Sequence, residues 1–165
     1  METTMALATQ PFPELDLTLG NFRRDHPTPT GLLMMQSVDT RLYSEVFDTV
    51  KTVFAAHGIS ILRADEKPAY GDRLLNVSTY MHGCHCGVVV LERFTSDFFY
   101  ANVSLQVGYM LALGKPILIL KDTTLPALRP DLVERLCKPF DAQYPRGTVP
   151  QIIEKWLRDK SLLEH

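Results

Sequence analysis

The sequence lacks the long apolar runs that a membrane or a secretory pathway requires. Its apolar stretches, such as residues 116–120, are far shorter than the roughly 20 residues that cross a bilayer. The first ten residues contain no basic segment followed by an apolar run, which is the pattern of a signal peptide. We therefore expect a soluble protein without a signal peptide and without a membrane partner.

The sequence also lacks an excess of basic residues and contains few cysteines. The 17 Lys and Arg are outnumbered by 19 Asp and Glu, and the charges are interspersed, so nucleic acid is not an expected partner. Three cysteines cannot all pair internally and do not form the framework of a small secreted fold. This cysteine usage favours a reducing compartment, and we expect the protein to be cytoplasmic.

Motifs for common cofactors are missing as well. Neither GxGxxG nor GxxxxGK[ST] occurs, which disfavours a dinucleotide oxidoreductase and a P-loop kinase. The segment 82–86, His-Gly-Cys-His-Cys, offers soft ligands, but its cysteines are only two residues apart and no second Cys/His pair completes a zinc site. We expect no metal here and interpret the segment as a helix end and turn, with cysteine buried as a small hydrophobic residue.

The 165 residues, 45% of them hydrophobic, suffice for one domain with one buried core. Residues 1–30 contain four prolines and show no regular hydrophobic period, so we predict an extended arm there. A single domain is predicted over residues 31–160. Residues 163–165, Leu-Glu-His, are interpreted as the remnant of a purification tag, the alternative being a native terminus.

Short apolar runs alternate with amphipathic stretches between these ends. The runs predict strands at residues 31–36, 59–62, 87–91, 116–120 and 138–141, and the stretches predict helices at residues 39–56, 72–80, 102–113, 130–136 and 149–157. Five such alternations favour a flavodoxin-like α/β fold, a doubly wound parallel sheet of about five strands in the order 2-1-3-4-5. The first and third strands would then lie side by side at its centre.

In such sheets a ligand binds beyond the carboxyl ends of the strands. The polar residues that end the predicted strands are therefore the first site candidates, namely Gln36, Ser37, Arg63, Asp65 and Glu92. An arginine at this place can grip a phosphate or carboxylate with two hydrogen bonds, and an aspartate can hold ribose hydroxyls. The alternative for Arg63 and Asp65 is an ion pair at the protein surface.

The most informative segment is residues 102–116, Asn-Val-Ser-Leu-Gln-Val-Gly-Tyr-Met-Leu-Ala-Leu-Gly-Lys-Pro, followed by an aliphatic strand. Together with Arg63-Ala64-Asp65, it resembles the TIR-like and nucleoside 2-deoxyribosyltransferase-like proteins. The resemblance spans roughly residues 31–141 in the order of elements. It implies cleavage of the N-glycosidic bond of NAD or a related nucleoside, with bacterial antiphage or stress defence as the setting. NAD or a nucleotide would be the substrate or ligand, with no prosthetic group.

The resemblance places Gln106 where the family carries its catalytic glutamate. Breaking a bond between ribose C1 and a base develops oxocarbenium character, which a carboxylate stabilises or traps covalently. An amide has nearly the same shape but no charge, so it cannot act as that nucleophile. Gln106 is then either an engineered exchange for glutamate or the mark of a natural chain that has given up catalysis; the third alternative is a helical glutamine without a role.

Two further positions depart from the family pattern. An acidic residue after the third strand is one methylene longer here, as Glu92, and Ala101 replaces a proline after three aromatics that end at Tyr100. Those aromatics either stack on a base or nicotinamide or pack within the loop.

The working hypothesis assigns each of these residues a place in one crevice at the strand ends. Asn102 and Glu92 orient ribose hydroxyls, Arg63 and Asp65 hold the distal part of the ligand, and Gln106 faces the reacting carbon. We expect Gln36 to line the same crevice. The competing hypotheses are a non-enzymatic nucleotide sensor or assembly module, and a nucleoside 2-deoxyribosyltransferase. TIR-like domains also commonly form composite sites, so the resemblance allows homo-oligomers or a partner effector protein.

Overall fold

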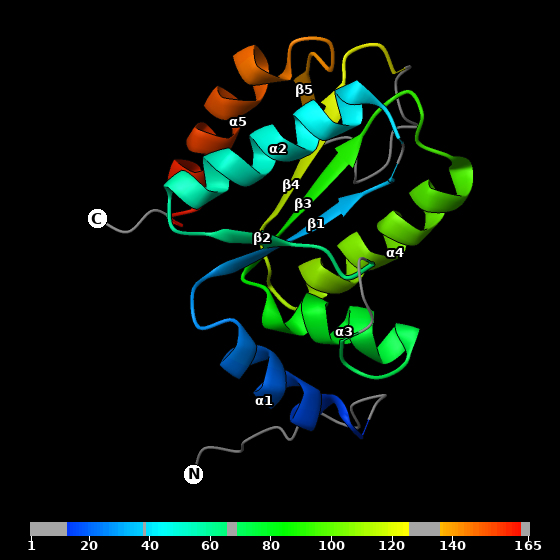
Figure 1. The fold of residues 1–165 in the computed structure, drawn as a ribbon, viewed down its shortest axis with the longest axis vertical. Coiled ribbons are helices and arrows are strands. Elements are labelled where there is room, and N and C mark those ends of the chain that lie inside the picture. Colours follow the sequence, from blue (N-terminus) through cyan, green and yellow to red (C-terminus); the bar gives the residue numbers. More distant parts are fainter. Residues whose placement is uncertain (1–12, 38, 66–68, 126–135, 163–165) are drawn as a thin grey trace.

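The fold is a five-stranded parallel sheet wound with helices on both faces (Figure 1), described here from a computed structural model for residues 13–37, 39–65, 69–125 and 136–162. The strand order is β2-β1-β3-β4-β5, and the strands span Thr30–Met35 (β1), Ser60–Leu62 (β2), Cys86–Leu91 (β3), Ile117–Asp122 (β4) and Cys137–Phe140 (β5). This confirms the predicted fold class and order, including β1 beside β3 at the centre. The last strand begins one residue earlier than predicted.

The central strands are buried on both faces because their side chains alternate between two hydrophobic clusters. Met34 on β1, Val89 on β3 and Ile119 on β4 lie in register and belong to one cluster. The residues that follow them, Met35, Val90 and Leu120, again pair in register and belong to the other. All six residues of β1 and of β3 are buried, which explains why these strands read as unbroken apolar runs.

Helices cover both faces of the sheet (Figure 1). The first cluster includes buried residues of α3 (Arg73–Gly83) and α4 (Asp97–Ala112), and the second includes those of α2 (Arg41–Ala56) and α5 (Pro145–Asp159). Three of the helices begin with a side-chain cap, in which Thr40, Asp72 or Ser96 accepts a hydrogen bond from a backbone N–H three residues on.

The Ser96 cap makes α4 start five residues earlier than predicted, so Tyr100 and Asn102 lie within the helix rather than before it or at its first residue.

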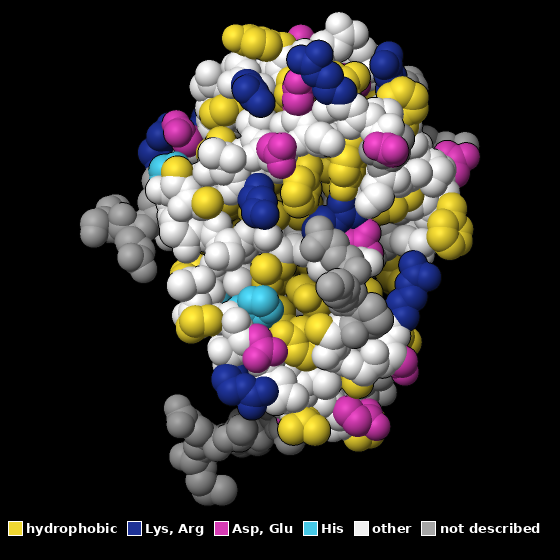
Figure 2. Space-filling view, viewed as in Figure 1, with side chains coloured by type: hydrophobic (Ala, Val, Ile, Leu, Met, Phe, Trp, Pro, Cys, Tyr) yellow, Lys and Arg dark blue, Asp and Glu magenta, His cyan; other side chains and the backbone are white. Residues whose placement is uncertain are grey.

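Figure 2 shows basic and acidic side chains interspersed over one face of the molecule, in keeping with the balanced composition.

The prediction of an extended arm over residues 1–30 is wrong for part of that segment, because Leu15–Asp25 forms helix α1. Leu15, Leu19 and Phe22 recur at helical spacing and are all buried. The helix packs on α3, where the Phe22 ring lies 5.3 Å from that of Tyr80 and the Thr18 and Thr79 hydroxyls are 2.7 Å apart. Prolines flank the helix on both sides. Because the segment contains so many of them, the sequence pattern did not indicate a helix with a short apolar face.

Two sequence expectations fall wholly or almost wholly outside the described residues. The helix predicted at 130–136 overlaps the described chain only at Leu136, and the proposed tag remnant at 163–165 is likewise not described. No helix in the described segments is long and apolar enough to cross a bilayer.

Replacing Phe22 by alanine should loosen α1 from the body of the domain. Phe22 is 1% exposed, and its ring also lies 5.7 Å from that of Tyr70. Because a buried phenylalanine leaves a large cavity when truncated, we expect Phe22→Ala to lower the free energy of unfolding by about 3 kcal/mol in urea titrations. Leu17→Ala, on the same helix but 70% exposed, should change it by less than about 0.5 kcal/mol. Equal effects of the two variants would contradict this packing.

Candidate functional site

The candidate site lies at the carboxyl ends of the strands, where the covered part of the sheet stops. Polar side chains follow the first three strands and end the fourth, namely Gln36 and Ser37 after β1, Arg63 and Asp65 after β2, Glu92 after β3, and Asp122 at the end of β4. Helices fill both faces of the sheet behind these residues. The strand ends are therefore the place where a polar ligand can approach from this side.

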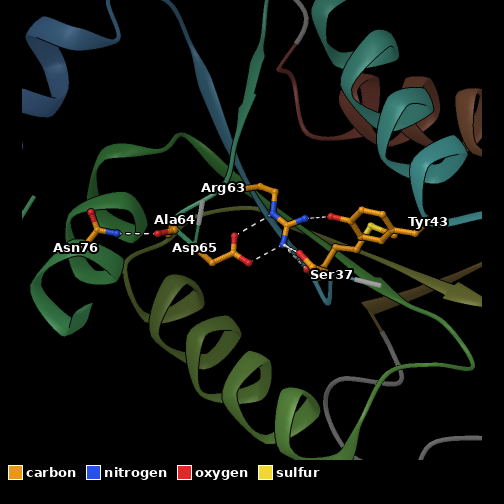
Figure 3. Close-up of polar contacts among 7 residues, drawn as sticks. Ser37, Tyr43, Arg63, Ala64, Asp65 and Asn76 are labelled. Carbon is orange, nitrogen blue, oxygen red and sulfur yellow. Dashed lines mark hydrogen bonds and ion pairs between the residues drawn. The ribbon is translucent and has the colours of Figure 1, made fainter. Parts of the chain in front are cut away.

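Arg63 is the centre of the first group of contacts (Figure 3). Its Nε donates to Asp65 Oδ1 at 2.9 Å and its Nη2 to Asp65 Oδ2 at 2.6 Å, which is a bidentate ion pair. The same Nη2 donates to the carbonyl of Met35 at 2.8 Å and to Ser37 Oγ at 2.9 Å. Nη1 donates to the Tyr43 hydroxyl. One guanidinium thus joins the ends of β1 and β2 to helix α2.

These contacts occupy most of the hydrogen-bonding capacity of Arg63, whose side chain is 4% exposed, while the side chain of Asp65 is 56% exposed. The pair is thus buried at one end and open to solvent at the other, unlike a free ligand-binding arginine or a simple surface ion pair. Its evident effect is to hold the chain segments around the site in place. A direct contact of Arg63 or Asp65 with a ligand stays a prediction.

The segment after Arg63 is held from the other side by Asn76 on α3 (Figure 3). Asn76 is 2% exposed, and its Nδ2 donates to the carbonyl of Ala64 at 2.8 Å. Its Oδ1 accepts from the backbone N–H groups of Ala69 and Tyr70. Our sequence analysis missed both Asn76 and Tyr43, because no local pattern distinguishes such a contact across elements from ordinary helical residues.

A pair of buried carboxyl groups forms the second part of the site. Leu91 on β3 is in register with Lys121 on β4, so the next residues, Glu92 and Asp122, are neighbours at the strand ends. Each is 3% exposed. They continue the alternation of Val90 and Leu120, which places both on the face covered by α2 and α5.

The two carboxyl groups differ in their hydrogen bonds. Asp122 Oδ2 accepts from the Thr124 hydroxyl at 2.7 Å and Oδ1 from the Thr124 backbone N–H at 3.2 Å. Glu92 Oε1 is buried without a hydrogen-bond partner in the described part of the chain. Burial, and then the charge of Asp122, raise the pKa of Glu92 above its ordinary value of 4.5. The strand-end rule that selected Glu92 applies equally to Asp122, which our site prediction omitted.

Gln36 and the residues of α4 lie toward the other face. Gln36 Oε1 accepts from the Ser96 backbone N–H at 2.7 Å, which ties the end of β1 to the start of α4. Tyr100 is half-buried against the cluster under α4. Asn102 is exposed and Gln106, one helical turn further, is half-buried.

The positions of Glu92 and Gln106 limit how one ligand could touch both. Glu92 lies on the face covered by α2, whereas α4 carries Gln106 over the opposite face. Such a ligand must therefore lie across the end of β3, beyond Leu91. The convergence of Asn102 and Gln106 with Glu92 remains a prediction.

The cysteine-rich segment lies at the opposite end of the sheet. Cys84 and Cys86 belong to the clusters on opposite faces, and burial raises the pKa of each thiol to about 12. This suits inert, packed thiols better than a shared metal ligand pair. Over the described ranges, no group of three or more His, Cys, Asp or Glu side chains is arranged to hold a metal ion.

Comparison with known proteins gives little beyond this geometry. No family model matches the sequence, and no curated protein matches it significantly. Among solved structures, the chain is similar to a 2-desoxiribosyltransferase from Leishmania mexicana, at 21% identity over 60% of this chain and 68% of that one, with a TM-score of 0.44. A likeness this weak concerns the fold and assigns no activity.

Removing the Arg63 guanidinium should destabilise the domain through its buried hydrogen bonds. We expect Arg63→Met to lower the free energy of unfolding by about 2 to 3 kcal/mol, a range reduced for the solvent exposure of Asp65. Arg63→Lys should recover little of it, because an ammonium cannot reproduce the planar fork. Arg41→Met removes a side chain that is 90% exposed and should cost less than about 0.5 kcal/mol. A full rescue by lysine in chemical denaturation would refute the bidentate role.

Glu92→Gln should change how stability depends on pH. Because the pKa of Glu92 is raised in the folded state, the folded protein binds this proton more tightly than the unfolded chain does. The contribution of Glu92 to stability should thus fall as the pH rises above about 4.5 and level off above the folded-state pKa. The advantage of Glu92→Gln over the wild type should grow over the same interval, as measured by thermal unfolding from pH 4 upward. Asp48→Asn, which removes an exposed carboxylate of α2, should show no such trend.

Proposed function

We propose that the protein binds a nucleoside or nucleotide at the carboxyl ends of β1, β3 and β4, and that the site is built for chemistry at the N-glycosidic bond. The observation that carries the proposal is the buried Glu92 carboxyl group, whose Oε1 has no partner within the described chain. A buried carboxyl oxygen without a hydrogen bond costs free energy, which a ligand with hydroxyl donors would recover.

The neighbouring charges favour a ribose at this point over a phosphate. Asp122 lies beside Glu92 and raises its pKa, so an anionic group placed there would meet electrostatic repulsion. The ribose of a nucleoside offers neutral hydroxyls, which donate to carboxylates without adding charge. The polar, partly exposed groups at Ser37 and Asp65 are then available to the more distal part of the ligand.

Asn102 and Gln106 on α4 supply the other side of the proposed site. A ribose seated across the end of β3 would have Glu92 on one face and the α4 side chains on the other. The resemblance of residues 102–116 to the TIR-like and nucleoside 2-deoxyribosyltransferase-like proteins supports a place for Gln106 beside ribose C1. With an amide at that position, the chain binds its ligand but has no charge to stabilise an oxocarbenium-like transition state.

Three outcomes are compatible with this geometry. A glutamate at position 106 would allow hydrolysis of NAD or a related nucleotide, or transfer of a deoxyribosyl group to a second base. With Gln106, the same site would serve as a nucleotide sensor. An acceptor base distinguishes transfer from hydrolysis, because only transfer yields a new nucleoside.

Gln106→Glu should create or restore cleavage of the N-glycosidic bond. A correctly placed charge of this kind is typically worth about 10² to 10³ in rate, and a covalent nucleophile is worth more. Both proteins would be incubated with NAD and with deoxynucleosides, with and without an acceptor base, and the released bases followed by chromatography. Gln151→Glu, which adds the same charge at an exposed position on α5, should stay inert.

The double variant Gln106→Glu, Glu92→Gln tests the ribose contact within the same assay. It should lose most of the new activity while remaining folded. If Gln106→Glu is inert on every substrate and both forms bind ligand equally, the proposed catalytic position is wrong and the sensor hypothesis replaces it. If neither form binds a nucleoside, NAD or a nucleotide in calorimetry, the site proposal itself fails.

A further inference from the structure

A hollow lies at the amino-terminal ends of the strands, opposite the proposed nucleoside site. It has a volume of about 450 Å³, within the range of small-molecule sites. One wall is the end of α1 and the linker that leads into β1, and the other is the end of α3 with the start of the loops around β3 and β4. Its lining is Phe22, Arg23, His26, Pro27, Thr28, Pro29, His82, Gly83, His85 and Lys115.

The charge of this lining has one sign. Arg23 and Lys115 are cationic, three histidines add further polar rings, and no carboxylate is among the lining residues. Burial and the charge of Arg23 both lower the pKa of Lys115, so the two cations influence each other across the hollow. An anion placed between them would relieve this repulsion.

Several hydrogen-bond donors in the lining remain available to a ligand. Lys115 Nζ donates to the carbonyls of His82 at 2.9 Å and Cys84 at 2.8 Å, which leaves the third N–H of the ammonium group. His85 Nδ1 accepts from the Thr30 backbone N–H at 3.2 Å, so the proton of the neutral ring is on Nε2. Nε2 is therefore a hydrogen-bond donor.

Favourable interaction of a cation with the C-terminus of a helix explains the place of Lys115 but not that of Arg23. Lys115 binds the carbonyls at the end of α3, as expected for a cation near a helix C-terminus. Arg23 lies in the last turn of α1, but across the described residues its guanidinium makes no ion pair, whereas the adjacent Arg24 bonds to Asn21 and lies near Asp25. Arg23 is the cation that lines the hollow, and Arg24 is not.

We propose that this hollow is a binding site for the phosphate group of a small phosphorylated molecule, held by Arg23, Lys115 and the ring N–H of His85. A guanidinium and an ammonium with an additional N–H donor match the several acceptor oxygens of a phosphate. The rings of the two linker prolines, Pro27 and Pro29, provide an apolar wall for the remainder of the molecule. The site is separate from the proposed nucleoside site and does not depend on it.

Inorganic pyrophosphate is the probe, because it has no ribose or base to engage the strand ends. We expect its addition to ¹⁵N-labelled protein to shift the backbone amide signals of Gly83, His85 and Lys115, while those of Glu92 and Asp122 stay unchanged. Arg23→Gln should weaken the binding about tenfold, the loss of one charge-assisted contact. Arg24→Gln, one residue away with the same charge change, should weaken it less than twofold.

Three results would overturn the proposal. One is the absence of shifts in the lining up to about 10 mM pyrophosphate, a concentration that detects even millimolar affinity. The second is an equal loss in Arg23→Gln and Arg24→Gln, which would indicate diffuse attraction to basic residues. The third is stronger perturbation of the lining by adenosine than by AMP, since the site would then select the nucleoside and not its phosphate.

Discussion

Helices cover both faces of β1, β3 and β4, so within the described residues a polar ligand can reach these strands only at their two ends. Apolar side chains of these three strands lie in register in rows, such as Met34 with Val89 and Ile119. A polar group buried within such a row would lack a hydrogen-bond partner. The carboxyl ends hold a buried acidic pair and the internally bonded Arg63, whereas the amino ends hold Arg23 and Lys115, which form no ion pair with the described residues. The two ends of the strands therefore differ in charge.

Arg63 shows how this fold gives rigidity to a surface made of loops. Parallel strands in this sheet are connected through helices, so the segments that follow β1 and β2 are not joined by a turn. The guanidinium joins them instead through the Met35 carbonyl, Ser37 and Asp65, and Asn76 holds the next segment to α3. Glu92 Oε1 can remain without a hydrogen-bond partner in the described part of the chain because the neighbouring segments are already fixed.

The hydrophobic pattern was sufficient to predict the sheet. Unbroken apolar runs in β1, β3 and β4 and the order of the elements led directly to the observed topology. The pattern failed to predict α1. Its three apolar residues lie among several prolines and are too few to give a clear helical period, although their burial against α3 stabilises the helix.

The site was predictable only as far as the strand-end rule reaches. That rule finds Arg63, Asp65 and Glu92, but not Tyr43 or Asn76, whose roles depend on contacts between elements distant in sequence. It also cannot tell that Arg63 is internally satisfied while Glu92 is not, because hydrogen-bond satisfaction is a property of the packed chain.

Helix α1 has a further consequence because Phe22 belongs both to the core under α3 and to the wall of the amino-terminal hollow. Local opening of a domain is easiest at peripheral elements that are attached through few buried side chains. When α1 lifts away, the hollow loses one wall, so a molecule bound there and the closed position of α1 stabilise each other by mass action. Amide protons of α1 would then exchange with solvent at a rate set by occupancy of the hollow, and the N-terminal helix would report on the concentration of its ligand.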